Sequence, residues 1–584
     1  MRLSRRSFLK QSSLATAAAY AAPRVFSRSY AAAATLGASA PVAPPSSNLP
    51  FAPGPFQPTW ESLSDFKTPD WFRDAKFGIW AHWGPQCQPE QGDWYARYMY
   101  ISSVSRSGRQ PDPSTGRPDA AYAYHVKNYG HPSKFGFKDV INTWKADQWD
   151  PEHLIGLYKR AGAKYFCALA NHHDNLDLWD SKYQSWNSVA VGPKKDLLGG
   201  WAKAARAAGL RFAVSSHAAH TWPWLEVAQG SDQTGEFAGV PYDGKMTKAD
   251  GKGLSWDGLD PQELYAQNHA LSRATTNGQF WDWPADGSVV LPDAAYCEKF
   301  YRRTIDLIDQ HQPDLVYFDD TILPLYPVSD IGLRIAAHQY NSSIKRTGNL
   351  EGIVTGKVLT NEAYRKCMVW DYERGSPNEM LERPWQTDTC IGDWHYKRSI
   401  FDNHTYKTPT TVARTLVDNV SKNGNLQLNI PLPGHGQPDT DELKFLADFT
   451  NWMDINSVGI HATRPWKIYG EGPSTQPNPN AAVRAQGFNE GRTTYGAQDF
   501  RFMQKDGVLY AFAMAWPTDG QYVITSLADG STLAPGKVER VELLGMNEPL
   551  KFTRDVGGLH LTLPEQKVGD YVFGLKISGS GLTA

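Results

Sequence analysis

Apolar runs and helical patterns alternate along most of the chain. Residues 150 to 162 combine an aspartate cap, a proline at the first helical position, an apolar stripe and a closing glycine, and the strand-like run KYFCALA follows directly. Residues 408 to 424 repeat the pattern before the run NLQLNI. This repeated helix-then-strand order predicts crossover helices between parallel strands, and it favours a (β/α)8-like TIM barrel over an open α/β sheet.

The pattern changes beyond about Pro465. Short segments with alternating polarity follow one another there, among them VLYAFAMAW, YVITSLA, GLHLTL and YVFGLKI. Such segments predict an antiparallel β-sandwich over residues 465–584, behind a barrel domain over residues 59–464. Residues 41–58 are too rich in proline for a helix or an inner strand, and they predict a linker.

The N-terminus has the features of an export signal. The segment MRLSRRSFLK carries paired arginines, and an alanine-rich apolar stretch with small-residue cleavage options follows it. We therefore interpret residues 1–40 as a twin-arginine signal peptide and expect a periplasmic or secreted protein. The apolar part is shorter than the roughly 20 residues that span a bilayer, so we expect no membrane span.

The composition of the chain indicates which kinds of ligand and partner are plausible for this protein. The chain has 584 residues, 41% of them hydrophobic, which is enough for at least two domains with large cores. Its 59 basic and 61 acidic side chains are balanced, so nothing indicates a nucleic-acid groove. The five cysteines lack CxxC spacing and indicate neither a disulfide framework nor a zinc site. The 21 tryptophans and 27 tyrosines suit both sugar stacking and ordinary cores.

Polar side chains gather where the predicted strands end, which is where barrel enzymes carry their sites. These candidates are His82, His172, His173, Asp174, His217, His220, Asp319, Asp320, Asp371 and Glu373. In PDLVYFDD, strand alternation puts Tyr317 and Asp319 on one side and Asp320 on the other. A second carboxylate at the next predicted strand end completes the pair that glycosidic bond cleavage requires.

Two other functions remain open at this point. Histidine-rich strand ends with a late aspartate also suit a metal-dependent barrel hydrolase. Because His172 and His173 are adjacent, their imidazoles would diverge on a regular strand, which counts against a metal site. A non-catalytic carbohydrate-binding protein is the third possibility, and the two carboxylates argue against it.

Several motifs occur in one order over roughly residues 60 to 470. They are WFRDAKFGIWAHWGP, GDWYARYMY, NHHDNLDLWDSKYQSWNSV, GPKKDLLGGWAKAARAAGLRFAV, PDLVYFDD, SKNGNLQLNIPLPGHG and INSVGIHATRPW. Together they resemble glycoside hydrolase family 29, the α-L-fucosidases. The resemblance implies a (β/α) barrel with a C-terminal β-sandwich, and exo-hydrolysis with retention through a fucosyl-enzyme intermediate. It implies no cofactor and no metal, and a fucosylated glycan or polysaccharide as the partner.

The resemblance also assigns roles to residues. The nucleophile of a PDxxWxD-type motif falls on Asp319, which leaves Asp320 outward or supporting. The sugar-binding histidines of the FGIFIHWG and HHDG motifs fall on His82, His172 and His173. Trp94 matches the tryptophan of an EWY motif, and Tyr317 takes the place of a sugar-stacking tryptophan.

The acid/base aligns less well. We assign it to Glu373, after the strand KCMVWDY, with Glu379 and Glu382 as alternatives. The later segment PWQTDTCIGDW ends in Trp394, a further candidate sugar contact. For the chemistry to work, the nucleophile should stay ionised and the acid should stay partly neutral.

Departures from the family pattern bear on specificity. Asp93 stands where the family has the glutamate of EWY, which contacts sugar hydroxyls, so the resemblance makes Asp93 a substrate-binding candidate with a side chain one methylene shorter. Ser215, Ser216 and His217 stand where the family often has YYS. We expect the missing tyrosine contacts to be taken over by His217 or another segment. Residues 218 to 290 form a long connection that should shape substrate access. A decorated fucoside, or a sugar related to fucose such as galactose, stays open as the substrate.

Overall fold

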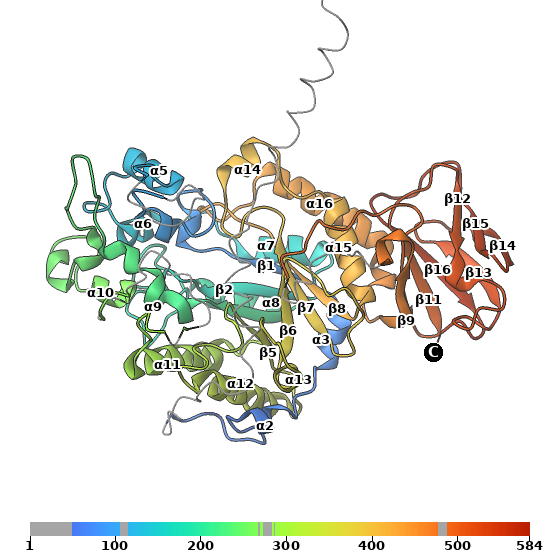
Figure 1. Cartoon of the computed structure of the whole chain (residues 1–584), viewed down its shortest axis with the longest axis horizontal. Coiled ribbons are helices and arrows are strands. Elements are labelled where there is room, and N and C mark those ends of the chain that lie inside the picture. The colour runs from blue at the N-terminus through green and yellow to red at the C-terminus, as the bar shows by residue number, and fades with distance from the viewer. Residues whose placement is uncertain are drawn as a thin grey trace, which may run out of the picture.

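The structure is a computed structural model that describes residues 49–104, 115–266, 269–272, 283–284, 286–476 and 487–583. The predicted signal peptide lies outside the described residues. Figure 1 shows a barrel domain that fills most of the molecule and a smaller β-domain, drawn in red, at one end of the long axis.

Eight parallel strands form a closed barrel in the order of the chain, which confirms the predicted fold class. The strands are β1 (Phe77–Ala81), β2 (Tyr165–Asn171), β3 (Arg211–Ser216), β4 (Leu315–Phe318), β5 (Ile353–Gly356), β6 (Val369–Glu373), β7 (Trp385–Cys390) and β8 (Gly424–Asn429). Nearly every strand residue is buried, because helices cover the outside and side chains fill the inside. The run at residues 353 to 356 was not among the predicted strands.

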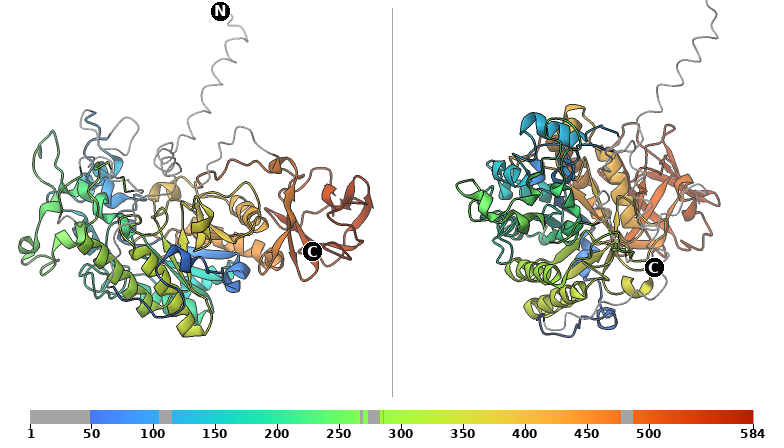
Figure 2. Two further views of the ribbon diagram at one scale, coloured as in Figure 1. Left: turned by 60° about the horizontal axis from the view of Figure 1, so that its bottom comes forward. Right: turned by 60° about the vertical axis from the view of Figure 1, so that its left-hand side comes forward.

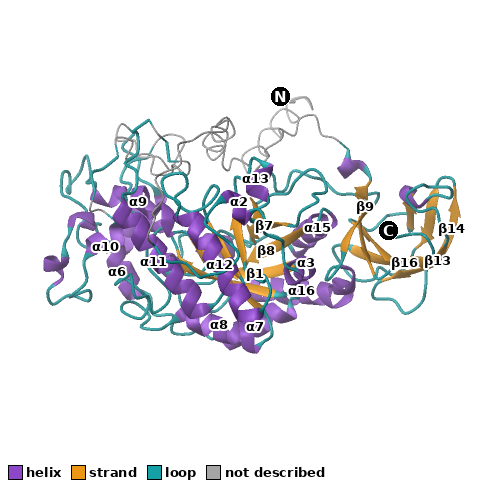
Figure 3. Ribbon diagram, turned by 90° about the horizontal axis from the view of Figure 1, so that it is seen from below, coloured by secondary structure: helices purple, strands orange, loops and turns teal. Residues whose placement is uncertain are grey.

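Helices cover the outside of the barrel, as Figure 3 shows for α7, α8, α11 and α12. The covering helices are α7 (Pro151–Arg160), α8 (Leu197–Ala207), α11 (Ala294–His311), α12 (Ile331–Thr347), α15 (Pro409–Ser421) and α16 (Thr440–Asn456). Two shorter helices are α3 (Asp70–Ala75), before β1, and α13 (Glu362–Arg365), between β5 and β6. The two predicted caps are present: Asp150 accepts the backbone N–H of His153, and Thr408 accepts that of Thr411. No helix among the described ranges has the length and apolar character needed to cross a membrane.

Long excursions leave the barrel after β1 and β3. Their short helices are α4 (Tyr95–Tyr98), α5 (Ala120–Asn128), α6 (Phe137–Thr143), α9 (Thr221–Trp224) and α10 (Pro261–Tyr265), while α2 (Trp60–Leu63) precedes the barrel and α14 (Arg398–Asp402) follows β7. In Figures 1 and 2, α5, α6 and α10 lie at the end of the molecule away from the C-terminal domain. Buried Asp243 ties the two excursions together, because Tyr100 and Tyr265 both donate their hydroxyls to it.

The C-terminal domain packs a five-stranded antiparallel sheet, in the order β13-β16-β11-β10-β9, with a three-stranded sheet, in the order β12-β15-β14. Its strands are β9 (Arg464–Glu471), β10 (Phe500–Lys505), β11 (Val508–Ala513), β12 (Gln521–Ile524), β13 (Val538–Leu543), β14 (Lys551–Asp555), β15 (Gly558–Thr562) and β16 (Phe573–Gly579). Apolar residues of both sheets, such as Phe500 and Leu561, share one core.

Two contacts fix segments of the chain to the barrel domain. Arg501 of β10 donates from Nε to Asp418 of α15 at 2.6 Å, and both side chains are buried. Residues 49–58, part of the segment predicted as a linker, pack on α12, where Asn341 accepts the backbone N–H of Phe56 at 3.0 Å. The rest of that segment lies outside the described residues.

Candidate active site

The predicted polar residues converge at one mouth of the barrel, because the carboxyl ends of parallel strands share one edge. His82 follows β1, His172 and His173 follow β2, His217 follows β3, Asp319 follows β4, and Glu373 ends β6. Asp93 and Trp94 reach the same mouth from the excursion after β1, and Trp394 reaches it from the loop after β7.

Asp319 is surrounded by cationic and imidazole groups. Its Oδ1 accepts from the Lys357 ammonium at 2.5 Å. Its Oδ2 lies 3.3 Å from His173 Nε2 and 3.2 Å from His217 Nδ1. Because His173 donates its Nδ1 proton to the carbonyl of His217 at 2.7 Å, the ring is held with Nε2 toward the carboxylate.

Asp320 faces away from this group. Its Oδ1 accepts the backbone N–H of Thr321 at 2.7 Å and lies 3.3 Å from His220 Nε2. It therefore supports the turn after β4, in keeping with the predicted split between the two aspartates.

Lys357 joins Asp319 to Glu373. Its ammonium donates to Glu373 Oε2 at 2.6 Å as well as to Asp319 Oδ1 at 2.5 Å, so these two oxygens lie within 5.1 Å of each other. Retaining glycosidases have carboxyl groups about 5–5.5 Å apart, whereas inverting enzymes have them about 6.5–9.5 Å apart. Both carboxylates keep part of their surface exposed, at 18% and 15% of the side chain, so a substrate can reach them.

The surroundings of the two carboxyl groups separate their pKa values. Burial alone would raise the pKa of Asp319, but Lys357, His173 and His217 together hold it well below its usual range. Burial raises the pKa of Glu373 to about 7; the carboxylates of Asp388 and Asp319 act in the same direction, and Lys357 opposes them. Near neutral pH one carboxyl group is thus ionised and the other is partly protonated, as a nucleophile and an acid require.

A second carboxyl pair lies below the mouth, inside the barrel. Burial and the neighbouring Asp388 raise the pKa of Asp371 well above its usual range. Asp388 accepts the hydroxyl of Tyr317 at 2.7 Å, and Asp371 accepts the side-chain N–H of Gln386 at 2.9 Å. Tyr317 therefore points across the barrel into this network, and its ring packs against Trp80 rather than standing alone as a stacking platform.

Imidazole rings form one wall of the site. The His82 ring lies 5.0 Å, centroid to centroid, from both His172 and His217. Burial lowers the pKa of His217 to about 4 and lowers those of His82 and His172 well below the usual value, so all three rings are neutral. Gln86 holds His172, donating its amide N–H to Nδ1 at 2.8 Å.

The two predicted tryptophans, Trp94 and Trp394, both lie beside these imidazole rings. Trp94 is buried and takes a left-handed backbone conformation at the start of α4, and its ring meets those of His173 and Trp224 edge-on. Trp394 is partly buried beside His82 and Trp80, and the Arg374 guanidinium lies 5.1 Å from its ring centre. The structure thus brings both tryptophans to the site.

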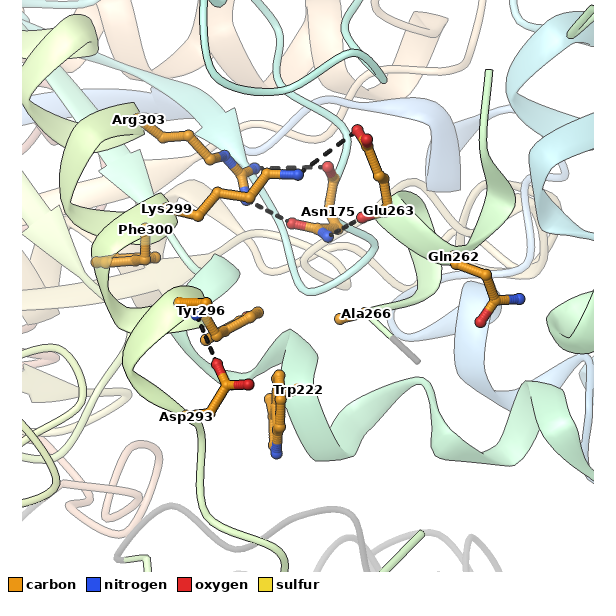
Figure 4. Close-up of a pocket in the computed structure, with 11 residues that line it drawn as sticks. Asn175, Trp222, Gln262, Glu263, Ala266, Asp293, Tyr296, Lys299, Phe300 and Arg303 are labelled. Carbon is orange, nitrogen blue, oxygen red and sulfur yellow. Dashed lines mark hydrogen bonds and ion pairs between the residues drawn. The ribbon is translucent and has the colours of Figure 1, made fainter. Parts of the chain in front are cut away.

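A separate pocket lies behind the turn that follows His172 and His173, and the residues that line it hold this turn in place. The cavity has a volume of about 180 Å³. Among the lining residues that Figure 4 shows, Arg303 donates to the Asn175 side chain at 2.7 Å, and Asn175 in turn donates to the carbonyl of Leu264 at 3.0 Å. Arg303 also pairs with buried Asp177. The excursion after β3 thereby fixes the turn that carries both histidines.

The alternative acid/base residues lie elsewhere. Glu379 and Glu382 are exposed, and the backbone carbonyl of Glu382 accepts from Asn423 immediately before β8 begins, at the opposite end of the barrel from Asp319. Glu373, in contrast, is held at the end of β6 by a segment from the C-terminal part of the chain, since Phe488 donates its backbone N–H to the Glu373 carbonyl at 2.7 Å. Only Glu373 of the three shares the mouth with the nucleophile candidate.

Two sets of side chains bring metal-ligand atoms within 4.8 Å of one another: His82, Asp93, His172 and His395, and His172, His173 and His217. The hydrogen bonds do not suit a cation. Since His172 Nδ1 accepts the Gln86 amide, its Nε2 carries a proton and has no lone pair to offer. His173 and His217 face the Asp319 carboxylate. These groups are arranged to exchange hydrogen bonds with a polar ligand.

The sequence-based interpretation missed Lys357, Asp388 and His395. Lys357 follows β5, and the short run GIVTGK, apolar and β-branched before a lysine, was the signal for it. Asp388 occupies an inward position of β7 in the segment WQTDTC. No local pattern marks His395, which donates its Nδ1 proton to Asp93 at 2.6 Å across 302 positions of the chain.

Comparison with known proteins agrees with this geometry. Residues 46–458 match the family model described as alpha-L-fucosidase, and residues 496–578 match the alpha-L-fucosidase C-terminal domain. Tissue alpha-L-fucosidase of Rattus norvegicus is 24% identical over 535 residues, covering 89% of this chain and 91% of the rat protein. Plasma alpha-L-fucosidase of Homo sapiens is 23% identical over 527 residues, covering 87% of this chain and 89% of the human protein.

Solved structures show the same fold. The structure of Thermotoga maritima alpha-fucosidase in complex with fucose matches with a TM-score of 0.59 and 23% identity, over 89% of this chain and 100% of that chain. The first family model spans the barrel with both carboxylates, and the second spans most of the C-terminal sheets. On these grounds the chain belongs to the alpha-L-fucosidase family, glycoside hydrolase family 29.

Proposed function

We propose that this chain is an exported, retaining exo-α-L-fucosidase with Asp319 as nucleophile and Glu373 as acid/base. Family membership supports the reaction class, and it disfavours the metal-dependent hydrolase and the non-catalytic binding protein. The observation that carries the roles is the approach of the Asp319 and Glu373 oxygens to within 5.1 Å, given their 2.5 Å and 2.6 Å contacts with one ammonium.

In the first step Asp319 Oδ attacks the anomeric carbon and the bond from that carbon to the leaving oxygen breaks. The proton on Glu373 passes to the leaving oxygen, which departs as an alcohol. In the second step Glu373, now ionised, takes a proton from water, and the oxygen of that water displaces Asp319 from the anomeric carbon. The pKa of about 7 for Glu373 suits both halves of this cycle at neutral pH.

The other residues at the mouth bind and orient the sugar. His82 and His172 present ring nitrogens for hydroxyl groups, and Trp94 and Trp394 supply aromatic surface for the apolar parts of the sugar. His173 instead holds the nucleophile, because its Nε2 lies 3.3 Å from Asp319 Oδ2 and its Nδ1 bonds the carbonyl of His217. Lys357 holds the two carboxylates at their separation and favours the ionised form of Asp319.

The decisive experiment is hydrolysis of aryl α-L-fucosides by the purified chain, followed by proton NMR of the first product anomer. We expect release of the α-anomer of fucose, at a rate that chelator does not change. First appearance of the β-anomer would contradict a double displacement. Hydrolysis of galactosides in preference to fucosides would contradict the sugar assignment.

Export is a separate part of the proposal and depends on Arg5 and Arg6 in the N-terminal segment. Replacing both arginines by lysine should leave the enzyme active in the cytoplasmic fraction of a host with twin-arginine transport and remove it from the exported fraction. Unchanged export of the double variant would contradict the assignment.

A further inference from the structure

His395 occupies a position in the site that neither the motifs nor the proposed roles use. It follows Trp394 in the loop after β7, and its ring is completely buried. The ring lies 4.5 Å from that of His82 and 4.7 Å from that of His172, centroid to centroid, and is steeply inclined to both. Three imidazoles from three different strand ends therefore form one cluster.

Hydrogen bonds fix the tautomers of two of these rings. Asp93 is a carboxylate and can only accept, so the 2.6 Å contact with His395 Nδ1 places the proton on Nδ1. The neutral ring then has its lone pair on Nε2, and this buried atom has no hydrogen-bond partner among the described residues. An unpartnered buried acceptor indicates a ligand that donates.

His172 has the opposite tautomer. Gln86 uses its amide nitrogen to donate to Asp174 at 3.0 Å and to His172 Nδ1 at 2.8 Å, while its oxygen accepts the backbone N–H of Ala96. His172 Nδ1 is thus an acceptor, and its Nε2 carries the proton. The site therefore offers one imidazole donor and one imidazole acceptor, on two rings whose centroids lie 4.7 Å apart.

A hydroxyl group complements this arrangement, because it accepts one hydrogen bond and donates another. A carbonyl or ether oxygen cannot satisfy His395 Nε2, and an ammonium cannot satisfy His172 Nε2–H. The carboxylate of Asp93 is one methylene shorter than a glutamate, and the imidazole bonded to it extends its reach toward the sugar.

We propose that His395 is a specificity-determining residue whose Nε2 accepts a hydrogen bond from one hydroxyl group of the bound sugar, while Asp93 holds the ring in the accepting tautomer. The inference rests on the proposed function, since it places the fucosyl group in this mouth. It adds a residue that distinguishes sugars by the position of one hydroxyl group. It also explains how an aspartate at position 93 can act on the sugar, because His395 spans the extra distance that a glutamate would cover.

The test uses aryl α-L-fucoside and its 2-, 3- and 4-deoxy analogues with the full chain, its His395→Phe variant and its His395→Gln variant. Removing a hydroxyl that is bound by buried groups should lower kcat/KM of the unmodified enzyme by about 10- to 100-fold at one position. His395→Phe should lower activity on the full fucoside by a similar factor and abolish the penalty for that one deoxy analogue. His395→Gln, which retains an acceptor, should restore part of the discrimination.

Other outcomes overturn the inference in distinguishable ways. Equal losses on all four substrates in both variants, with unchanged thermal unfolding, would mean that His395 positions the site as a whole and binds no single hydroxyl group. Loss of activity on chelation and recovery with Zn²⁺ would make the cluster a metal site. Failure of the unmodified enzyme to hydrolyse any fucoside would instead overturn the proposed function. Should His395→Phe not fold, Asp93→Asn replaces it, because an amide at position 93 no longer demands the proton on Nδ1 and should weaken the same positional discrimination.

Discussion

Asp319 at the end of β4 and Glu373 at the end of β6 bind the same ammonium, at 2.5 Å and 2.6 Å. The strand between them, β5, supplies that ammonium through Lys357. Three neighbouring strand ends therefore fix the geometry of the catalytic pair, and each of the three side chains can be tested separately.

Replacing Asp319 by alanine should lower kcat roughly 10⁴-fold or more while the protein still folds, because no other carboxylate can form the fucosyl intermediate. Steady-state kinetics and mass spectrometry with a mechanism-based 2-fluoro fucoside check this, since the intermediate should be trapped on Asp319. The matched control is Asp320→Asn, which keeps an acceptor for Thr321 and should retain most of the activity.

Glu373→Gln should lower kcat/KM by about 10²- to 10⁴-fold on substrates with poor leaving groups and much less on activated aryl fucosides, because kcat/KM reports the step in which Glu373 acts as the acid. In the unmodified enzyme, kcat/KM should fall as pH rises through about 7, because the acid is lost when Glu373 ionises. This alkaline limb should vanish in the variant. Glu379→Gln and Glu382→Gln, both exposed and away from the mouth, serve as controls and should leave the profile unchanged.

Lys357→Met should move the pH profile of kcat/KM toward higher pH. The ammonium lowers the pKa of both Asp319 and Glu373, so its removal raises both. The nucleophile then needs a higher pH to ionise, and the acid stays protonated to a higher pH. An exposed lysine on α16 gives the control, Lys444→Met, whose profile should match that of the unmodified enzyme. Limbs that do not move in the Lys357 variant would argue against its electrostatic role.

Gly487→Ala should impair catalysis although the residue belongs to the C-terminal domain. A Cβ atom there would lie 2.2 Å from the backbone oxygen of Glu373, so the acid/base strand end must shift. Misplacement of a catalytic group by about 1 Å can cost up to about 10²-fold in rate. Gly491→Ala has a comparable positive φ but meets nothing within 4 Å, so it isolates the backbone strain. Equal kcat values for the two variants would show that Gly487 does not position Glu373.

Arg501→Met should destabilise the protein by about 3–5 kcal/mol, because among the described residues it leaves buried Asp418 with Lys422 as its one cationic partner. Urea unfolding measures this loss, and the exposed pair between Arg540 and Glu542 gives the control, Arg540→Met, at about 0–1 kcal/mol.

Burial opposes ionisation of Asp418, but Lys422 and Arg501 lower its pKa to about 2. Their contribution is therefore present above about pH 4 and lost as pH falls toward 2, and the variant should show a weaker acid dependence.

Much of the site followed from the pattern at the strand ends. Apolar runs that stop at His82, at His172 and His173, and at Asp319 could be placed at one mouth, because parallel strands of a barrel share their carboxyl edge. The alternation of side chains along a strand was also enough to separate Asp319 from Asp320. The later strands were harder, since β5 has only four residues and β6 carries Asp371 and Glu373 on the same face.

The barrel, the C-terminal sheets, the family and the two carboxylates could all be predicted from the chain alone, because periodicity and ordered motifs are local properties of a sequence. Three contacts could be found only in the folded molecule. Lys357 bridges these carboxylates, Asp93 bonds His395 from 302 positions away, and the backbone of Gly487 packs against that of Glu373. Each of these contacts joins residues on different strands or domains, and their distance in space is set by packing and strand register. No pattern along the chain encodes such a distance.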